Sequence, residues 1–278
     1  MLTALHIKKK DHKNALARFF YSFLPDKIKV ETKTADKVSL RSITYISHKD
    51  RVNFSKIDAL VKAQRNRLLC SEKVHLPEHL GYKRFCDIDY KKRLCTNLAL
   101  ELLRECKSAN LKVGLVDIDG DYSLYPKYLL KYCDNLSIVT HDIKHYSGVC
   151  EELLSETGVS VVLSRRFDVL KTCNLVVAVS KMDFSVKLSD TALLLCVEKP
   201  SYKTSYTTIF DYSVNMPNHL TNLCTEGLSD TYIMSALYSL CALYELGVYV
   251  PSLCVSQNCV HTLSSLKNMI AESSKNLT

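Results

Sequence analysis

The chain has 278 residues, of which 47% are apolar and 24% are charged, and its formal net charge is +8. This composition is typical of a globular protein and excludes disordered and fibrous chains. No run of about 18 apolar residues is present, so we expect no membrane-spanning helix. Met1 to Lys13 lacks the apolar core of a secretory signal, and we therefore expect a cytoplasmic protein.

Positive charge is concentrated in the first part of the chain. Residues 1–110 hold 24 Lys and Arg against 12 Asp and Glu, whereas the other 168 residues hold 13 against 17. A basic region can attract an anion or a nucleic acid. Here the basic residues are dispersed rather than clustered with aromatic residues. We therefore expect them on solvated surfaces and do not expect nucleic-acid binding; the oligomeric state stays open.

The residue pattern changes near residue 110 and predicts three regions. A basic α+β region covers residues 1–110, and an α/β domain covers 111–215. The remaining residues, 216–278, are expected to form helices that pack on the preceding parts.

In the first region, apolar residues at helical spacing predict a helix over residues 11–24. Alternating apolar and polar residues then predict a hairpin with strands 27–34 and 38–47. Two further helices are expected, one beginning near Ser55 and one over 90–107.

From residue 111 onward, short apolar strands alternate with helical segments. The expected strands are 112–117, 136–140, 159–163, 175–179, 192–197 and 207–210. The expected helices are 125–132, 145–157, 167–172, 231–246 and 256–273. Apolar strands that alternate with helices predict a parallel sheet buried on both faces. The predicted fold class is therefore α/β: a Rossmann-like parallel sheet, preceded by a smaller basic α+β region and followed by C-terminal helices.

Twelve cysteines are spread along the chain from Cys70 to Cys259 without a CxxC pair. Most stand within apolar runs, and a free cysteine packs as a small hydrophobe, so we interpret them as buried thiols. Cys254, Cys259 and His261 are close enough in sequence to suggest metal ligands. No fourth ligand is evident for them, so no metal site is assigned.

The segment most informative about function follows the first strand of the α/β domain. Val113–Ser123 reads Val-Gly-Leu-Val-Asp-Ile-Asp-Gly-Asp-Tyr-Ser, which places three carboxylates and one glycine where the strand meets the next helix. In a doubly wound sheet, ligands bind beyond the carboxyl ends of the strands. We therefore predict a binding site in this turn and at the ends of two later strands. Its residues are Asp117, Asp119, Gly120, Asp121, Ser123, Thr140 and Ser180.

Residues 111–215 resemble the NAD(P)-binding Rossmann domains of the type found in glutamyl-tRNA reductase and shikimate dehydrogenase. The resemblance rests on the expected strand order and on Asp168–Ser180, where a short helix leads into a strand that ends in a small polar residue. It implies a dinucleotide-binding domain with NAD(P) as cofactor. The turn departs from the family, which carries G-x-G-x-x-G/A after the first strand. Here Asp117–Tyr122 contains one glycine and three carboxylates.

This departure changes the electrostatics of the turn. A pyrophosphate needs close approach of the backbone and a positive helix N-terminus. Each close contact between like charges costs about 1 kcal/mol or more at a partly exposed site, so three carboxylates oppose the anion. A cation reverses the sign, because Mg²⁺ takes oxygen ligands and bridges to phosphates. The cofactor is therefore left open between NAD(P) and Mg²⁺.

A second resemblance concerns the same turn. An apolar strand followed by Asp117-x-Asp119-Gly120 is similar to the first motif of the haloacid-dehalogenase-like phosphatases. The resemblance implies that Asp117 is the nucleophile and Asp119 the general acid/base, beside Mg²⁺.

The later motifs of that family match less well. Leu136–Thr140 is similar to the second motif, a strand that ends in a phosphate-binding threonine. Lys171 and Asp183 would take the remaining roles. The acidic pair usual after the fourth strand is absent, and Asp121 stands where the family has Thr or Val.

We predict a divergent Rossmann-like protein that binds a nucleotide or phosphorylated metabolite at this turn, and we leave open whether it is an enzyme. One alternative is a Mg²⁺-dependent phosphohydrolase that uses Asp117 and Asp119. Another is an interaction protein that uses the sheet as a scaffold and binds a partner through Lys62, Arg65 and Arg67. The turn can also be purely structural, because carboxylates stabilise the start of a helix.

Overall fold

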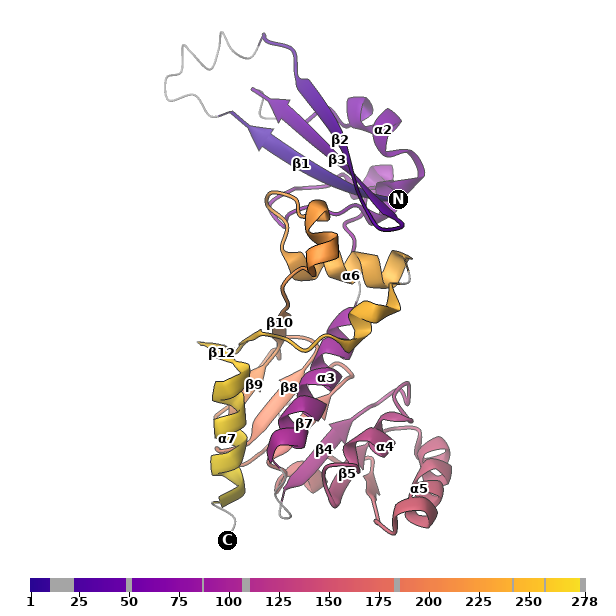
Figure 1. Cartoon of the computed structure of the whole chain (residues 1–278), viewed down its shortest axis with the longest axis vertical. Coiled ribbons are helices and arrows are strands. Elements are labelled where there is room, and N and C mark those ends of the chain that lie inside the picture. Colours follow the sequence, from indigo (N-terminus) through magenta and orange to yellow (C-terminus); the bar gives the residue numbers. More distant parts are fainter. Residues whose placement is uncertain are drawn as a thin grey trace. The chain divides into compact units, whose positions relative to one another are not determined.

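Figure 1 presents a computed structural model of the chain. The structure describes residues 1–10, 23–48, 52–86, 88–106, 111–182, 186–241, 243–257 and 259–275. The helix expected over 11–24 lies outside these residues except for its last two. None of the helices within the described ranges combines the length and apolar character that a bilayer crossing requires.

Contacts between residues divide the chain into two compact units, each built from two segments. Unit 1 comprises Met1–Asp87 and Asn215–Leu246, and unit 2 comprises Ile88–Val214 and Gly247–Thr278. The domain boundaries expected near residues 110 and 215 stay sequence-based predictions.

Unit 1 contains a three-stranded sheet of order β1–β3–β2 (Figure 1). β1 (Leu2–Lys9) runs parallel to β3 (Val38–Ser47), and β2 (Lys27–Ala35) runs antiparallel to β3. The β2–β3 pair confirms the expected hairpin. One face of the sheet buries Leu5, Ile43 and other apolar side chains against α2 (Phe54–Val61). That face supplies the core of the first segment.

The second segment of unit 1 is helical. It contains the 3₁₀ helix Asn218–Leu223, α6 (Asp230–Cys241) and the start of the 3₁₀ helix Tyr244–Val248. The prediction of one helix over 231–246 is therefore corrected, because the α-helix ends at Cys241. Two of its hydrogen bonds link this segment to the first. The Asn222 side-chain amide donates to the Thr34 carbonyl at 3.0 Å, and the Tyr232 hydroxyl donates to the Phe85 carbonyl at 2.9 Å.

Unit 2 is built on a six-stranded sheet of order β6–β5–β4–β7–β8–β9, in which all neighbouring strands are parallel. The strands are β4 (Lys112–Val116), β5 (Asn135–Val139), β6 (Val162–Ser164), β7 (Leu175–Ala178), β8 (Leu193–Cys196) and β9 (Thr207–Ile209). β7 and β8 are buried at every position, as their uninterrupted apolar sequences predict. The α/β class with a Rossmann-like parallel sheet is confirmed.

Most helices of unit 2 begin and end near the positions that the sequence predicts, but the last one begins seven residues later than predicted. The helices are α3 (Asp89–Cys106), α4 (Tyr125–Leu129), the 3₁₀ helix Phe167–Leu170, α5 (Ile143–Thr157) and α7 (Leu263–Lys275). Asp142 caps α5 by accepting a hydrogen bond from the His145 amide at 3.2 Å. Gly158 ends α5 with a left-handed φ of 71°. α4 is shorter than the helix expected over 125–132.

The end of the chain corrects the prediction of a helix over 256–273. Two short strands, β11 (Leu253–Val255) and β12 (Val260–Thr262), come first, and α7 begins only at Leu263. β11 pairs with β10 (Asp211–Ser213), about 40 residues earlier in the chain. That distant partner stabilises the strand conformation, and the local sequence gives no sign of it.

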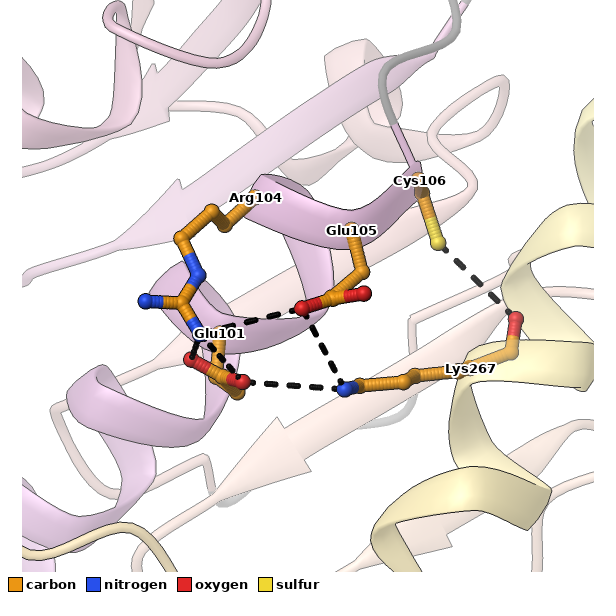
Figure 2. Close-up of polar contacts among 5 residues, drawn as sticks. All are labelled: Glu101, Arg104, Glu105, Cys106 and Lys267. Atoms are coloured by element: carbon orange, nitrogen blue, oxygen red, sulfur yellow. Dashed lines mark hydrogen bonds and ion pairs between the residues drawn. The ribbon is translucent and has the colours of Figure 1, made fainter.

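Two sets of contacts hold α7 in unit 2. Lys267 forms ion pairs with Glu101 and Glu105 of α3 at 3.6 and 3.7 Å, as Figure 2 shows. The second contact is buried: the Asn174 amide donates to the carbonyl oxygen and Oγ of Ser273 at 3.2 and 3.0 Å. Asn174 Oδ1 also accepts from the Lys112 amide at 3.0 Å, so one side chain connects α7 to the start of β4.

Candidate functional site

The strand order creates a switch point between β4 and β7. From β4 the chain winds outward through β5 to β6, and from β7 it winds in the opposite direction to β9. In doubly wound sheets, the loops after the two central strands diverge where the winding reverses, and ligands bind there, at the carboxyl edge of the sheet. The segment after β4, residues 117–123, the residue after β5, Thr140, and Ser180 after β7 all stand at this edge.

Asp117 is the first residue after β4, and it is 1% exposed. Its Oδ2 accepts two hydrogen bonds, one from the Tyr146 hydroxyl at 2.6 Å and one from the Tyr122 amide at 2.8 Å. Two donors stabilise the carboxylate in a buried position. Burial and, next, the hydrogen bond to Asp117 hold the pKa of Tyr146 well above its ordinary value, so this phenol remains a donor. Asp117 therefore links the start of the turn to Tyr122 at its end by a hydrogen bond.

Ser180 and Thr140 connect the neighbouring strand ends to the same turn. The Ser180 hydroxyl accepts from the Ile118 amide at 2.9 Å, which joins the end of β7 to the end of β4. Thr140 is fully buried and its hydroxyl accepts from the Asp142 amide at 3.1 Å. The His141 amide donates to the Ile118 carbonyl at 3.1 Å. The two hydroxyls thus hold the loops at the carboxyl edge of the sheet in place by hydrogen bonds.

The tip of the turn differs from this buried base. Gly120 adopts a left-handed φ of 81°, and a Cβ there would lie 3.5 Å from that of Asp142. Within the described residues, the amides of Asp119, Gly120 and Asp121 have no hydrogen-bond acceptor. Successive amides in such a turn can form a concavity for an anionic oxygen. The tip is therefore the part of the turn with unused hydrogen-bonding capacity.

The charges at the tip work against an anion. The carboxylates of Asp119 and Asp121 are exposed, and Ser123 is half-buried. Lys92 of α3 offsets part of the negative charge, because its Nζ lies 3.8 Å from Asp121 Oδ2 and 5.6 Å from the centre of the Tyr122 ring. The exposed carboxylates are suitable ligands for a hard cation. An NAD(P) pyrophosphate fits the open amides but not the flanking carboxylates.

The residues suggested by the phosphatase resemblance do not all come together. Lys171 stands four residues before β7 begins, on the side of the sheet where strands start. Asp117 stands at the opposite edge, where β4 ends. Asp183 lies outside the described residues.

One residue of this site escaped the sequence analysis. Tyr146 lies one turn into α5 and is fully buried beside Asp117. The signal for it was weak: Tyr146 and Leu153, seven residues apart, share the buried face of the helix. A polar donor on that face, four residues after the cap Asp142, points back toward the strand ends.

In the described part of the chain, the cysteines and the C-terminal cluster give no sign of a metal site. Six of the described cysteines are buried, as expected: Cys70, Cys95, Cys133, Cys173, Cys196 and Cys254. Cys254 and His261 are opposite each other on β11 and β12. His261 Nε2 lies 3.1 Å from Ser256 Oγ. Among the described residues, no three His, Cys, Asp or Glu side chains gather in a way that could hold a metal ion.

Comparisons with known proteins give little. No family model matches the chain, and no curated protein sequence matches it. Several solved structures are similar to the chain, and three of them have TM-scores between 0.29 and 0.34. The Δ1-pyrroline-2-carboxylate reductase of Thermococcus litoralis, solved with NADH and L-proline, has a TM-score of 0.29 and 8% identity over 39% of this chain and 36% of its own.

The other two structures are similarly distant. A probable ornithine cyclodeaminase from Bordetella pertussis has a TM-score of 0.29 and 19% identity over 42% of this chain and 40% of its own. The L-tryptophan dehydrogenase of Nostoc punctiforme has a TM-score of 0.34 and 11% identity over 99% of this chain and 80% of its own. The matches to the first two proteins thus span well under half of their length. Because these scores are low, we base the proposal below on the strand order and the turn.

Proposed function

We propose that unit 2 binds a nucleotide or another phosphorylated metabolite at the carboxyl edge of β4 and β7. The observation that carries this proposal is the turn at Asp119–Asp121, where three consecutive amides have no acceptor among the described residues. They surround a left-handed glycine at the switch point of the sheet. A sheet of this order offers a ligand crevice there, and open amides in a turn attract a phosphate oxygen.

The predicted site residues then fall into two groups. Asp117, Thr140 and Ser180 have hydrogen-bond partners inside the protein, so we propose that they hold the turn in place. Asp119, Gly120 and Asp121 face solvent at least in part, and we propose that they contact the ligand, with Ser123 beside them. This division assigns the ligand to the tip of the turn rather than to its buried base.

Two exposed carboxylates beside the phosphate favour a ligand that arrives with a divalent cation. Asp119 and Asp121 would provide oxygen ligands to Mg²⁺, which also bridges to phosphate. The resemblance to NAD(P)-binding domains makes a dinucleotide the other candidate. A dinucleotide must overcome the repulsion without a cation, with Lys92 as the nearby positive group.

The burial of Asp117 supports binding over phosphoryl transfer. A carboxylate nucleophile must reach the phosphorus atom of its substrate. Asp117 is 1% exposed, and two donors hold its Oδ2. The turn would have to open before this carboxylate could attack.

Thermal unfolding of the full chain tests the proposal. We would measure the melting temperature with NAD⁺, NADP⁺, ATP, GTP and sugar phosphates, each with and without Mg²⁺. A ligand at 100 times its dissociation constant adds about 2.7 kcal/mol to the stability of the native state, which raises the melting temperature by a few degrees. A rise with NAD(P) alone favours a dinucleotide site, and a rise that needs Mg²⁺ favours the cation-bridged site. No rise with any of these ligands contradicts the proposal and favours a scaffold for protein interaction.

A pair of glycine variants then locates the ligand. Gly120→Ala and Gly158→Ala both put a side chain at a left-handed φ, 81° and 71° respectively, so both lose stability. Gly158 ends α5, away from the turn after β4. We expect Gly120→Ala to weaken the ligand-induced rise and Gly158→Ala to retain it. An equal rise in both variants would place the ligand elsewhere.

A further inference from the structure

One face of the β1–β3–β2 sheet of unit 1 is apolar, and the opposite face is polar over part of its area. Leu5, Ile43 and Tyr45 belong to the apolar face and pack into the core. Because side chains alternate along a strand, their neighbours lie on the other face. On that face Leu2, Ala4 and Leu40 are buried, and beside them lies a mostly polar patch of two residues from β1, three from β3 and three from β2. They are His6, Lys8, Ser42, Thr44, Ile46, Lys29, Glu31 and Lys33.

These eight side chains line a cavity of about 240 Å³. Thr225 and Glu226, which follow the 3₁₀ helix Asn218–Leu223, complete its wall. The cavity is somewhat smaller than the roughly 300–1,000 Å³ typical of sites for drug-sized ligands, so it suits a small metabolite or a single charged group. Every residue of this cavity belongs to unit 1.

A row of three residues crosses the cavity floor. In the strand register His6 is the partner of Thr44, and Thr44 is the partner of Lys29. His6 Nε2 is buried and has no hydrogen-bond partner in the described structure. Buried polar atoms of native proteins normally have a partner, either in the protein or in a bound molecule. This atom therefore has capacity for a ligand.

The charges around the cavity are mostly positive and only partly compensated. Lys8 forms an ion pair with Glu226 at 2.6 Å, and Lys33 donates to the Cys224 carbonyl at 2.5 Å. Lys29 makes no hydrogen bond or ion pair with the described residues. The Glu226 side chain is 82% exposed, so an anion in the cavity could displace it from Lys8.

We propose that this cavity binds the phosphate group of a small metabolite, with Lys29 and Lys8 contributing positive charge and His6 Nε2 donating a hydrogen bond. Thr44, between His6 and Lys29 in the row, contributes its hydroxyl. The site is separate from the proposed site at the switch point, because no residue of unit 2 lines it.

The state of His6 provides a local readout. Burial, followed by the positive charge of Lys8, lowers the pKa of His6, while Glu226 raises it and Lys33 lowers it. Lys29 and Glu31 face the same cavity from β2. A phosphate beside the ring stabilises the imidazolium, so binding raises the pKa of His6.

The experiment is an NMR titration of the full chain with inorganic phosphate, at constant ionic strength maintained with chloride. The ring signals of His6 are assigned by comparison with His6→Gln. We expect a saturable shift of these signals and an increase in the pKa of His6 at saturation. The absence of a saturable shift at His6 would overturn the proposal, even if phosphate perturbs residues of unit 2.

Three variants distinguish a built site from general attraction by positive charge. Two opposite unit charges about 4 Å apart attract each other by about 1 kcal/mol even in water, which corresponds to a roughly fivefold change in affinity. Lys29→Gln should therefore weaken phosphate binding about fivefold or more. Glu226→Gln should strengthen binding, because it releases Lys8 and removes a negative charge. Lys37→Gln, at an exposed position in the turn between β2 and β3 and outside the cavity lining, should change affinity less than twofold. Equal losses in Lys29→Gln and Lys37→Gln would overturn the proposal.

Thr44→Val provides a check that does not alter charge. This substitution keeps the shape of a half-buried strand residue and removes only its hydroxyl. We expect weaker phosphate binding with an unchanged melting temperature in chloride. If Thr44→Val binds phosphate as tightly as the unchanged protein while Lys29→Gln still weakens binding, the site attracts phosphate by charge alone. That result would contradict the role proposed for the row of His6, Thr44 and Lys29.

Discussion

Asp117 combines two features that rarely coexist, a negative charge and almost complete burial. The Tyr146 hydroxyl and the Tyr122 amide make this arrangement stable by donating to the same oxygen. The hydroxyl comes from α5 and the amide from the turn itself. The pair therefore fixes the turn relative to the helix that follows β5.

Removing the Tyr146 hydroxyl measures how much its hydrogen bond to Asp117 contributes to stability. We expect Tyr146→Phe to lower the free energy of unfolding by about 1.5–3 kcal/mol, because a buried carboxylate loses a charge-assisted hydrogen bond. Tyr128→Phe is the matched control, since Tyr128 is 51% exposed and should change stability by less than about 0.5 kcal/mol. Urea denaturation measures both. Equal stability of the two variants would show that the Asp117 carboxylate does not depend on Tyr146.

Among the elements, β4 is one of the two central strands of the sheet. It lies between β5 and β7, and Gly114 in its middle faces the side chain of Leu170. A Cβ added at Gly114 would come within 2.6 Å of Leu170 Cδ2. The 3₁₀ helix Phe167–Leu170, which precedes β7, therefore packs on β4 at a distance that only glycine allows.

A second pair of glycine variants tests this packing. Gly114→Ala should destabilise unit 2 by about 1–3 kcal/mol, because the added methyl group overpacks the core. Gly148→Ala in α5 has nothing within 4 Å and should add roughly 0.5–1 kcal/mol through helix propensity. Chemical denaturation should therefore give changes of opposite sign. A stabilising Gly114→Ala would contradict the close contact with Leu170.

The attachment of α7 offers a contrast between exposed charges and a buried amide. Lys267 makes two ion pairs in Figure 2, and its partner Glu105 is about half exposed. Glu101, which is 17% exposed, also pairs with Arg104 and so keeps a positive partner when Lys267 is replaced. Such pairs are worth about 0–1 kcal/mol, so Lys267→Gln should have little effect on stability.

Asn174→Ala should cost about 2–4 kcal/mol, because it leaves the Lys112 amide and the buried Ser273 carbonyl without the partner that Asn174 provides. Thermal unfolding ranks the two, and a larger loss in Lys267→Gln would contradict this account.

Local sequence patterns predicted the sheet and most helices. They failed where pairing with a strand far away in the sequence determines the secondary structure. The alternation in β2 and β3 and the apolar runs of β7 and β8 report directly on burial. β12 lies within the segment predicted as helix. It pairs with β11, which in turn pairs with β10 about 40 residues earlier in the chain.

The candidate site was predictable in place but not in detail. The turn after β4 follows from the strand–helix pattern. The partners of Asp117 and Ser180 depend on how loops meet in three dimensions. The sequence could not distinguish the buried base of the turn from its open tip.

At the scale of the molecule, the buried thiols make stability sensitive to alkaline pH. Burial raises the pKa values of Cys95, Cys133, Cys173 and Cys254 to about 12. In the unfolded chain a thiol ionises near pH 8.5. The unfolded state therefore releases protons first as pH rises, which favours unfolding.

The expected result is constant stability below about pH 8.5 and a progressive loss from there toward pH 12. Each thiol contributes about 1 kcal/mol per pH unit over that range. Urea denaturation under reducing conditions from pH 7 to 10.5 measures the slope. Cys95→Ala should reduce this slope by the contribution of about one proton. Stability that stays constant to pH 10.5 would contradict the burial of these thiols.

The central claim is that a phosphorylated ligand binds at the switch point of unit 2, and amide hydrogen exchange tests it most directly. The full chain would be measured with saturating NADH, NADPH and ATP in turn, each with and without Mg²⁺. The account predicts that at least one ligand slows exchange of the amides at residues 119–121, with smaller effects after β5 and β7. Unchanged exchange at these three amides with every ligand would contradict it, and protection confined to the cavity of unit 1 would contradict it equally.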